Sequence, residues 1–178
     1  MEELLTRVAS EHRTPAAGSA AAAAAVLATA LVIKAARRSR DVWPEAGGSI
    51  AQASALAARL REISSTIETT YEAAMAALET HDDDAIARTL PPAADAALEL
   101  ARASADVAEL AAEAAHHCDQ AHHADVTVAA VMAESAARSG AHLVGINLLI
   151  RPDDGRAWEA ARQAERACQA SAMLANER

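Results

Sequence analysis

Apolar residues recur every three or four positions over most of the chain, which is the spacing of a helix with one buried face. The clearest stripe lies in residues 50–80 and consists of Ile50, Ala53, Leu56, Leu60, Ile63, Ile67, Thr70, Ala74 and Leu78. The only β-like run, residues 144–150, continues the helical pattern that precedes it. We therefore predict helices throughout the chain and no strand.

Proline, glycine and aspartate residues divide this pattern into segments. We predict a short amphipathic helix in residues 1–11 and longer helices at 19–39, 50–80, 92–118, 125–149 and 155–176. Pro92 is placed to begin its helix, and residues Asp82–Asp84 could cap a short helical turn before Pro91 and Pro92. The predicted fold class is all-α: an antiparallel bundle of about five long helices plus short helices, forming a single domain over residues 1–178.

Residues 20–33 are apolar except for Thr29, and most of them are alanine. A transmembrane helix needs about 20 residues of stronger hydrophobicity than alanine provides, and Lys34 interrupts this run too early. We expect a buried helix that is apolar on all sides rather than a membrane span.

The composition adds to this picture. Hydrophobic residues make up 52% of the chain but aromatic residues only 2%, so the core must consist of small and aliphatic side chains that let helices approach closely. The net charge is −9 and the basic residues are scattered, which argues against nucleic-acid binding. With two cysteines and no signal-like segment, we expect a reducing, cytoplasmic location.

Four features could contribute to a site. The start of the alanine-rich helix, around Gly18 and Ser19, offers backbone N–H groups to an anionic or carbonyl group, although Ser19 could simply cap the helix. Asp125 begins an otherwise apolar helix and could likewise be an N-cap. Asn147 is a lone amide among apolar residues, where a buried polar group needs a partner. Tyr71, the only tyrosine, is either a core aromatic or a proton donor in a cleft.

The segment 116–123 is rich in metal-binding residue types. Cys118 and His122 are four residues apart, as are Asp119 and His123, so each pair would share one face of a helix. The segment contains no CxxC or HExxH motif. We interpret it as a solvated polar junction and expect no metal site.

Three stretches resemble, in order, segments of the cyclodeaminase/methenyltetrahydrofolate cyclohydrolase family. TPAAGSAAAAAAVLATAL (14–31) resembles its Pro-Thr-Pro-Gly-Gly-Gly-Ser segment, and PPAADAALELARASADVAELAAEAA (91–115) resembles its Pro-x-x-Ala-rich helix. ADVTVAAVMAESAARSGAHLVGINL (124–148) resembles its late segment, which contains Ser-Asp and Asn-Val-x-Ile-Asn-Leu. The resemblance covers nearly the whole chain and implies an all-helical homodimer that opens or closes a C–N bond on a reduced folate, without a cofactor.

The resemblance also implies roles for individual residues. Asp125 matches a family aspartate, and a carboxylate there would neutralise a cationic C=N centre or accept a proton. Gly18 and Ser19 match the end of the glycine-rich turn that borders the ligand. Asn147 matches the second asparagine of the late motif.

Other positions depart from the family pattern. Ala16 and Ala17 replace two of the three glycines, Leu143 replaces the first asparagine of the late motif, and Tyr71 or Thr70 replaces an aspartate in the long helix. These changes make the expected site more apolar and less suited to the polar parts of folate, although tyrosine can still donate a proton.

Three hypotheses follow. The first is an enzyme that forms or opens a C–N bond in a nitrogen-containing ring through an imine or iminium centre, acting on a small non-folate molecule of specialised metabolism. The second is an ordinary folate cyclohydrolase or cyclodeaminase, and the third is a non-catalytic helical homodimer that binds a ligand. For the first, the expected catalytic residues are Asp125 and Tyr71, and the expected substrate-binding residues are Gly18, Ser19, Thr70, Leu143 and Asn147. The expected partners are a small imine or amine, or a folate derivative, and a second copy of the chain, with no nucleic acid and no membrane.

Overall fold

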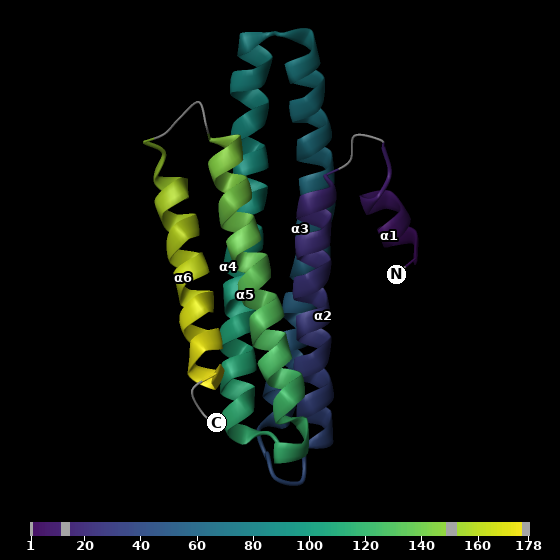
Figure 1. Cartoon of the computed structure of the whole chain (residues 1–178), viewed down its shortest axis with the longest axis vertical. Coiled ribbons are helices and arrows are strands. Elements are labelled where there is room, and N and C mark those ends of the chain that lie inside the picture. The colour runs from purple at the N-terminus through teal and green to yellow at the C-terminus, as the bar shows by residue number, and fades with distance from the viewer. Residues whose placement is uncertain (1, 12–14, 149–152, 176–178) are drawn as a thin grey trace.

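The described residues of the computed structural model, 2–11, 15–148 and 153–175, form an elongated all-α bundle without strands (Figure 1). The helices are α1 (Glu2–Val8), α2 (Ala16–Arg38), α3 (Ala46–Thr80), α4 (Asp83–His117), α5 (His123–Asn147) and α6 (Gly155–Ala175), and a 3₁₀ turn, η1 (Gln120–His122), precedes α5. The predicted fold class of five long helices plus short ones is confirmed. The predicted ends at 149 and 176 lie outside the described residues.

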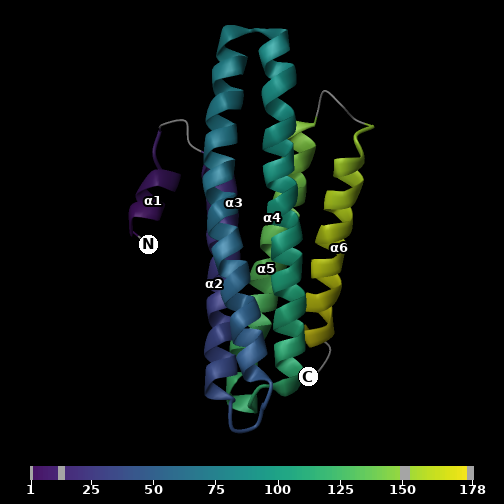
Figure 2. The ribbon, with the colours of Figure 1, turned by 180° about the vertical axis from the view of Figure 1, so that it is seen from behind.

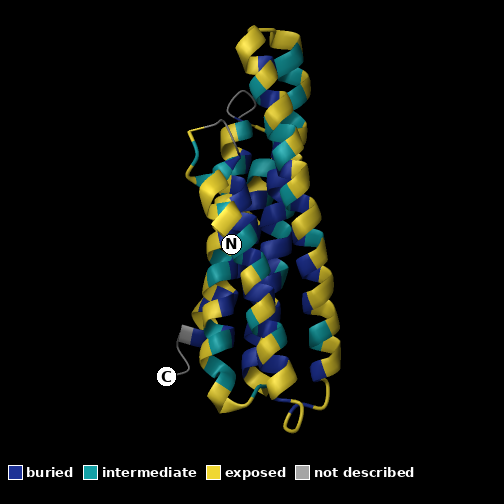
Figure 3. Ribbon diagram, turned by 90° about the vertical axis from the view of Figure 1, so that its right-hand side faces the viewer, coloured by how far each residue is buried: buried dark blue, intermediate teal, exposed yellow. Residues whose placement is uncertain are grey.

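Successive long helices run in opposite directions, so the four helices α2–α5 form an up-down bundle (Figures 1 and 2). Helix α4 packs against α2, α3, α5 and α6, and α6 covers the α4–α5 side of the bundle. The far end of α3 and the beginning of α4 extend beyond the other helices as a two-helix hairpin, in which exposed and intermediate residues predominate (Figure 3).

The core is built from alanine and branched aliphatic side chains, as the composition requires. Leu60, Leu100, Val107 and Val126 are fully buried, and most of the remaining buried positions are alanine. Small side chains allow the helix axes to approach closely, so the core is held together mainly by aliphatic van der Waals contacts, with Trp43 as its one buried aromatic residue among those described. Helix α2 is the one described helix long and apolar enough to span a membrane, and it packs against α3, α4 and α5.

Several predicted helix boundaries were wrong; α1 ends at Val8 rather than at residue 11, and α5 begins at His123 rather than at residue 125. Helix α2 begins at Ala16 rather than at residue 19, so Gly18 and Ser19 lie within its first turn. Helix α3 begins at Ala46, so the two glycines that follow are helical rather than part of a loop. Glycine lowers helix propensity by about 1 kcal/mol, which the packing of the rest of a long helix readily offsets.

Helix α4 runs through Pro91 and Pro92 instead of beginning at Pro92. Of the three aspartates expected to cap a short turn here, Asp82 is the N-cap, and the helix that it caps is α4 itself: its carboxylate accepts hydrogen bonds from the N–H groups of residues 84 and 85. The two prolines deprive the carbonyl groups one turn earlier of their helical donors, but that turn lies in the exposed hairpin, where water can hydrate them. The carbonyl oxygen of Pro91 accepts a hydrogen bond from Nη1 of Arg156.

Candidate functional site

An apolar pocket of about 270 Å³ lies where α2 begins and α5 ends, between the middle of α3 and α4. We call it the helix-end pocket. Its lining is made of Pro15, Ala16, Ala17, Gly18, Ile67, Thr70, Tyr71, Ala74, Ala93, Ala97, Leu143, Ile146 and Asn147. The pocket thus brings together five of the seven predicted site residues from three helices.

The local sequence explains how each wall forms. Pro15 precedes α2 with its fixed φ, and three small residues follow, so no bulky side chain fills the space beside the helix start. Ile67, Thr70 and Ala74 belong to the apolar stripe of α3 that the sequence predicted, and Tyr71 lies beside that stripe. The last turn of α5 supplies the remaining wall.

Gly18 allows α2 to approach α3. A Cβ atom at this position would lie 2.7 Å from Cγ2 of Ile67 and 3.7 Å from Cδ1 of Leu143. A Cβ atom at position 18 would therefore crowd the Ile67 wall of the helix-end pocket and make only an ordinary van der Waals contact with Leu143.

The polar groups of the pocket are few and uncharged. The Thr70 hydroxyl donates a hydrogen bond to the Thr66 carbonyl oxygen at 2.8 Å, so it is engaged within its own helix. Tyr71 and Asn147 are half-buried, and their side chains form no hydrogen bond with the part of the chain that the structure describes. The phenol and the amide are therefore the two side-chain groups that can hydrogen-bond a ligand.

Two helix ends of opposite polarity also face the pocket. The first turn of α2 carries unpaired N–H groups and a partial positive charge, and the last turn of α5 carries carbonyl groups and a partial negative charge. A ligand with a carbonyl or anionic group at one end and a cationic nitrogen at the other would match this arrangement.

Ser19 does not line the helix-end pocket. Its side chain is buried on the other side of α2, where the hydroxyl donates a weak hydrogen bond to Oε1 of Glu68 at 3.4 Å. Arg7 of α1 binds the same carboxylate oxygen at 2.6 Å. Ser19 is therefore neither the N-cap of α2 nor part of the pocket, and it contributes to the packing of α1 and α3 on α2.

Asp125 lies at the opposite end of the bundle. It sits in the first turn of α5, where Oδ2 pairs with Nζ of Lys34 at 2.8 Å and lies 3.8 Å from Nδ1 of His122. Asp125 and Asn147 are 22 positions apart on α5, which at 1.5 Å per residue separates them by about 33 Å along the axis. Within one chain, Asp125 and Tyr71 therefore cannot act on the same atoms.

The histidine-rich segment is a helix junction. His117 ends α4, stacks on Trp43 with ring centroids 5.5 Å apart, and its Nε2 lies 2.9 Å from a carboxylate oxygen of Glu113. The chain turns at Cys118 and Asp119, so the expected four-residue pairs do not share a helical face. Burial raises the pKa of the Cys118 thiol, which makes it a poorer metal ligand. Among the described residues, no group of three histidine, cysteine or acidic side chains is placed to hold a metal ion.

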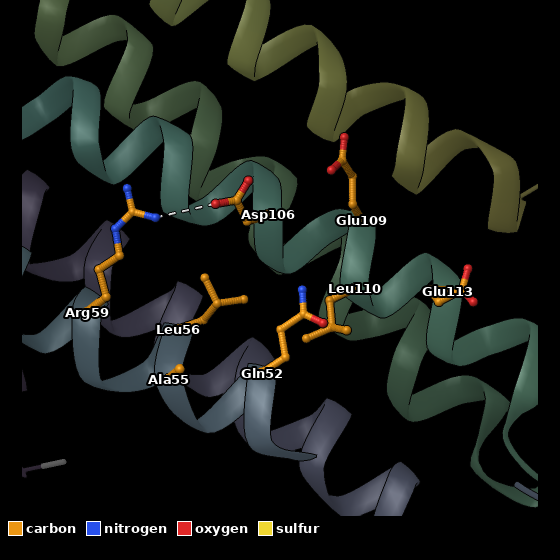
Figure 4. A pocket seen from close by; sticks show the side chains of 8 residues that line it. All are labelled: Gln52, Ala55, Leu56, Arg59, Asp106, Glu109, Leu110 and Glu113. Carbon is orange, nitrogen blue, oxygen red and sulfur yellow. Dashed lines mark hydrogen bonds and ion pairs between the residues drawn. The ribbon is translucent and has the colours of Figure 1, made fainter. Parts of the chain in front are cut away.

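A second depression, between α3 and α4, is wide and charged (Figure 4). Its carboxylates already have partners: Arg59 contacts Asp106 at 3.4 Å, and Arg166 of α6 contacts Asp106 and Glu109. Glu113 is the neighbour of His117 described above. These ion pairs join α3, α4 and α6, so we interpret the depression as a structural junction rather than a ligand site.

Comparison with known proteins agrees with the all-α fold. The family described as Formiminotransferase-cyclodeaminase matches residues 1–166. Among solved structures, the formiminotetrahydrofolate cyclodeaminase of Thermotoga maritima superimposes with a TM-score of 0.86 at 20% sequence identity, covering 98% of this chain and 94% of that chain. At this identity the structural match demonstrates a shared fold. None of the curated proteins matches the sequence.

Proposed function

The chain belongs to the formiminotransferase-cyclodeaminase family, and from this premise we propose that it is an enzyme that opens or closes a nitrogen-containing ring by breaking or forming a C–N bond. The observation that carries the proposal is the helix-end pocket. It places the Tyr71 phenol and the Asn147 amide, both without partners among the described residues, between two helix ends of opposite polarity.

The proposed chemistry uses these groups in different ways. A ring closure of the cyclodeaminase type joins an amine nitrogen of the substrate to an imine carbon; the amine loses its proton to solvent, and the former imine nitrogen leaves that carbon as ammonia. Tyr71 would donate a proton to the departing nitrogen, and Asn147 would orient the substrate by hydrogen bonding. The carbonyl groups at the end of α5 would stabilise positive charge on the C=N centre, because such charge is weakly solvated in an apolar pocket.

A reduced folate is the first substrate class to test, since the family and the Thermotoga maritima neighbour favour it. The decisive experiment incubates the purified protein with methenyltetrahydrofolate and with formiminotetrahydrofolate. Hydrolysis of the methenyl form lowers its near-ultraviolet absorbance, whereas cyclisation of the formimino form raises that absorbance and releases ammonia. A rate equal to the spontaneous rate in both assays would contradict a folate substrate.

A compact non-folate substrate is the second candidate, and the uncharged lining of the pocket favours it. The described lining has no arginine, lysine or histidine to bind the carboxylates of a glutamate tail, and its volume of about 270 Å³ suits a small molecule. An amino ketone that cyclises to an imine with loss of water is a suitable probe. Binding of either class without turnover would instead favour the non-catalytic binding protein.

The homodimer is also part of this proposal. Size-exclusion chromatography with light scattering tests it directly, and a monomer at micromolar concentration would contradict it.

A further inference from the structure

We propose that the helix-end pocket continues as an apolar furrow along the α3–α4 hairpin, and that this furrow binds an aliphatic chain attached to the ring of the substrate. The substrate class is then a cyclic imine, or the open-chain amine that forms it, with an alkyl tail. The reaction at the ring rests on the proposed function, whereas the binding of the tail is argued from the shape and polarity of the hairpin.

The lining of the pocket already reaches the base of the hairpin. Ala74 of α3 and Ala93 of α4 both line the pocket, and both are buried. Beyond them α3 continues to Thr80, and α4 comes back from Asp83. Figures 1 and 2 show this part of the two helices beyond the ends of α2 and α5. The pocket therefore adjoins a pair of helices that no other described helix covers.

The helical register places three larger apolar residues on the face of the hairpin that continues the pocket. On α3, Leu78 lies four positions after Ala74, and on α4, Leu90 and Ile86 lie three and seven positions before Ala93. At about 100° per residue, each of them lies within about 60° of the alanine on its own helix. These five residues border one depression of the hairpin, which we call the hairpin furrow.

The larger side chains of the hairpin furrow are accessible to a ligand. Leu78 is 41% exposed, and Ile86 and Leu90 are half-buried. Among the described residues, neither hydrophobic core cluster contains these three or has them packed against it. Figure 3 shows that exposed and intermediate residues predominate in this hairpin. Because two helices cover each other from one side only, an apolar face remains for a third group.

The polarity of the hairpin furrow selects an aliphatic chain. The residues that define it are all uncharged, and the charged residues of the hairpin lie off this face. Glu72 and Glu79 on α3, and Arg88 and Asp95 on α4, are rotated by about 140–160° from the alanine on the same helix. A carboxylate tail would find no cation among the residues of the furrow, whereas an alkyl chain would remove apolar surface from water.

The direction of the hairpin furrow suits a polar ring with one tail. Tyr71 and Asn147, the two side chains that can hydrogen-bond a ligand, lie in the pocket. The ring therefore stays between the helix ends, and the tail leads away along the hairpin. Seven positions separate Ala93 from Ile86, which at 1.5 Å per residue is about 10 Å along α4. A chain of several methylene groups can lie along this distance.

A series of saturated cyclic amines tests the tail site without any reaction. The probes are pyrrolidines that carry a methyl, propyl, pentyl or heptyl group on the carbon beside the nitrogen, and isothermal titration calorimetry measures their binding to the full chain. Each added methylene group should tighten binding about two- to fourfold, because it is transferred from water to the apolar furrow.

Two variants locate the tail. Leu78→Gln and Leu90→Gln should reduce the gain to less than twofold per methylene group and leave the affinity for the methyl compound unchanged. Glutamine has nearly the helix propensity of leucine, so the hairpin is retained. Met173→Gln is the matched control, because Met173 is 53% exposed on α6, and it should bind the series as wild type does. Circular dichroism confirms the fold, and Leu78→Gln alters an exposed position, so it decides the result if Leu90→Gln does not fold.

Each outcome supports or overturns the proposal. Affinities that rise with chain length in wild type and become flat in Leu78→Gln support it. Equal wild-type affinities, no binding of any pyrrolidine, or an unchanged rise in both variants would overturn it. Flat wild-type affinities together with a change in the oligomeric mass of Leu78→Gln, measured by light scattering, would assign this face to contact between copies.

The tail site and the proposed function can fail separately. Affinities that rise with chain length, without turnover of any tested substrate, would refute only the proposed function. Turnover of a short amino ketone together with flat affinities would refute only the hairpin furrow as a binding site.

Discussion

Gly140 on α5 packs directly on the backbone of α4 at Ala101. A Cβ atom on Gly140 would lie 2.8 Å from the Ala101 nitrogen and 3.0 Å from the carbonyl oxygen of Ala97. Backbone atoms of a packed helix cannot rotate away as a side chain can. The close approach of α5 to the α4 backbone at Ala97 and Ala101 therefore depends on glycine at this position.

Gly140→Ala should lower the free energy of unfolding by about 1–3 kcal/mol, because α4 and α5 must separate to admit the methyl group. The matched control is Gly145→Ala, on the same helix, where a Cβ atom would meet nothing within 4 Å. That change should be neutral or stabilising by up to about 1 kcal/mol. Urea unfolding of both variants measures the difference, and equal stabilities would contradict the close packing.

Ser104→Ala should leave stability unchanged or raise it by about 1 kcal/mol, which is unusual for a core substitution. The Ser104 hydroxyl oxygen is fully buried and has no hydrogen-bond partner within the described chain. Alanine removes this unsatisfied group and leaves only a small void. Thermal unfolding followed by circular dichroism provides the measurement, and a loss above 1 kcal/mol would indicate a hydrogen bond that the structure lacks.

Tyr71→Phe should reduce kcat by about 10²–10⁴-fold if the phenol donates a proton, with little change in KM. Asn147→Leu, which preserves volume but removes the amide, should mainly raise KM. Ser65→Ala, on the exposed face of the same helix as Tyr71, is the control and should behave as wild type. Steady-state kinetics on the identified substrate separates these outcomes, and full activity of Tyr71→Phe would exclude its catalytic role.

Gly18→Ala should weaken substrate binding and also lower the free energy of unfolding, because the added methyl group would lie 2.7 Å from Cγ2 of Ile67 in the pocket wall. The close atom, Cγ2 of Ile67, is bonded directly to Cβ of a β-branched side chain, so the contact of 2.7 Å is relieved only by a change of the Ile67 χ1 rotamer or by separation of α2 from α3. Ile67→Ala removes Cγ2 and should partly restore binding in the double variant. Ligand titration of the two single variants and the double variant tests this coupling, and strictly additive effects would contradict it.

Acid should destabilise the protein partly through Glu99. Burial opposes its ionised form, but the guanidinium groups of Arg59 and Arg102 outweigh this, and the pKa of the Glu99 carboxyl lies below its usual range. Because the pKa of Glu99 is lower in the folded state, its ionised carboxylate stabilises the folded protein. This stabilisation is fully present above the unfolded-state pKa of about 4.3, and it is lost as the pH falls through the folded-state pKa.

The corresponding measurement compares the melting temperature between pH 7 and pH 3 for wild type and Glu99→Gln. At pH 7, Glu99→Gln should have a lower melting temperature than wild type. Between pH 7 and pH 3, its melting temperature should fall less than that of wild type. Glu72→Gln, on an exposed position of α3, is the control. Parallel pH curves for wild type and Glu99→Gln would contradict the assignment.

The sequence alone determined the class of fold, because helix formation depends on local spacing. The steps of three and four around Leu56, Leu60 and Ile67 can be seen in the sequence itself. The low aromatic content likewise required a core of closely packed small and aliphatic side chains. Candidate residues that lie on such stripes or at helix ends, Thr70, Tyr71, Leu143 and Asn147, met in one pocket with Gly18. The spacing of these residues along their predicted helices was what indicated which side of each helix they would occupy.

The tertiary structure decided what register cannot specify. Ser19 and Gly18 are adjacent in sequence, yet successive positions on a helix are rotated by about 100° and these two face different neighbours. Asp125 and Asn147 lie within one family-like segment, but a straight helix keeps them at opposite ends of the bundle. Pro91 and Pro92 remain helical because their turn is solvated and supported by Arg156. Sequence spacing fixes the direction of a side chain around its own helix, whereas its partners depend on how separate helices pack, and that is a property of the whole chain.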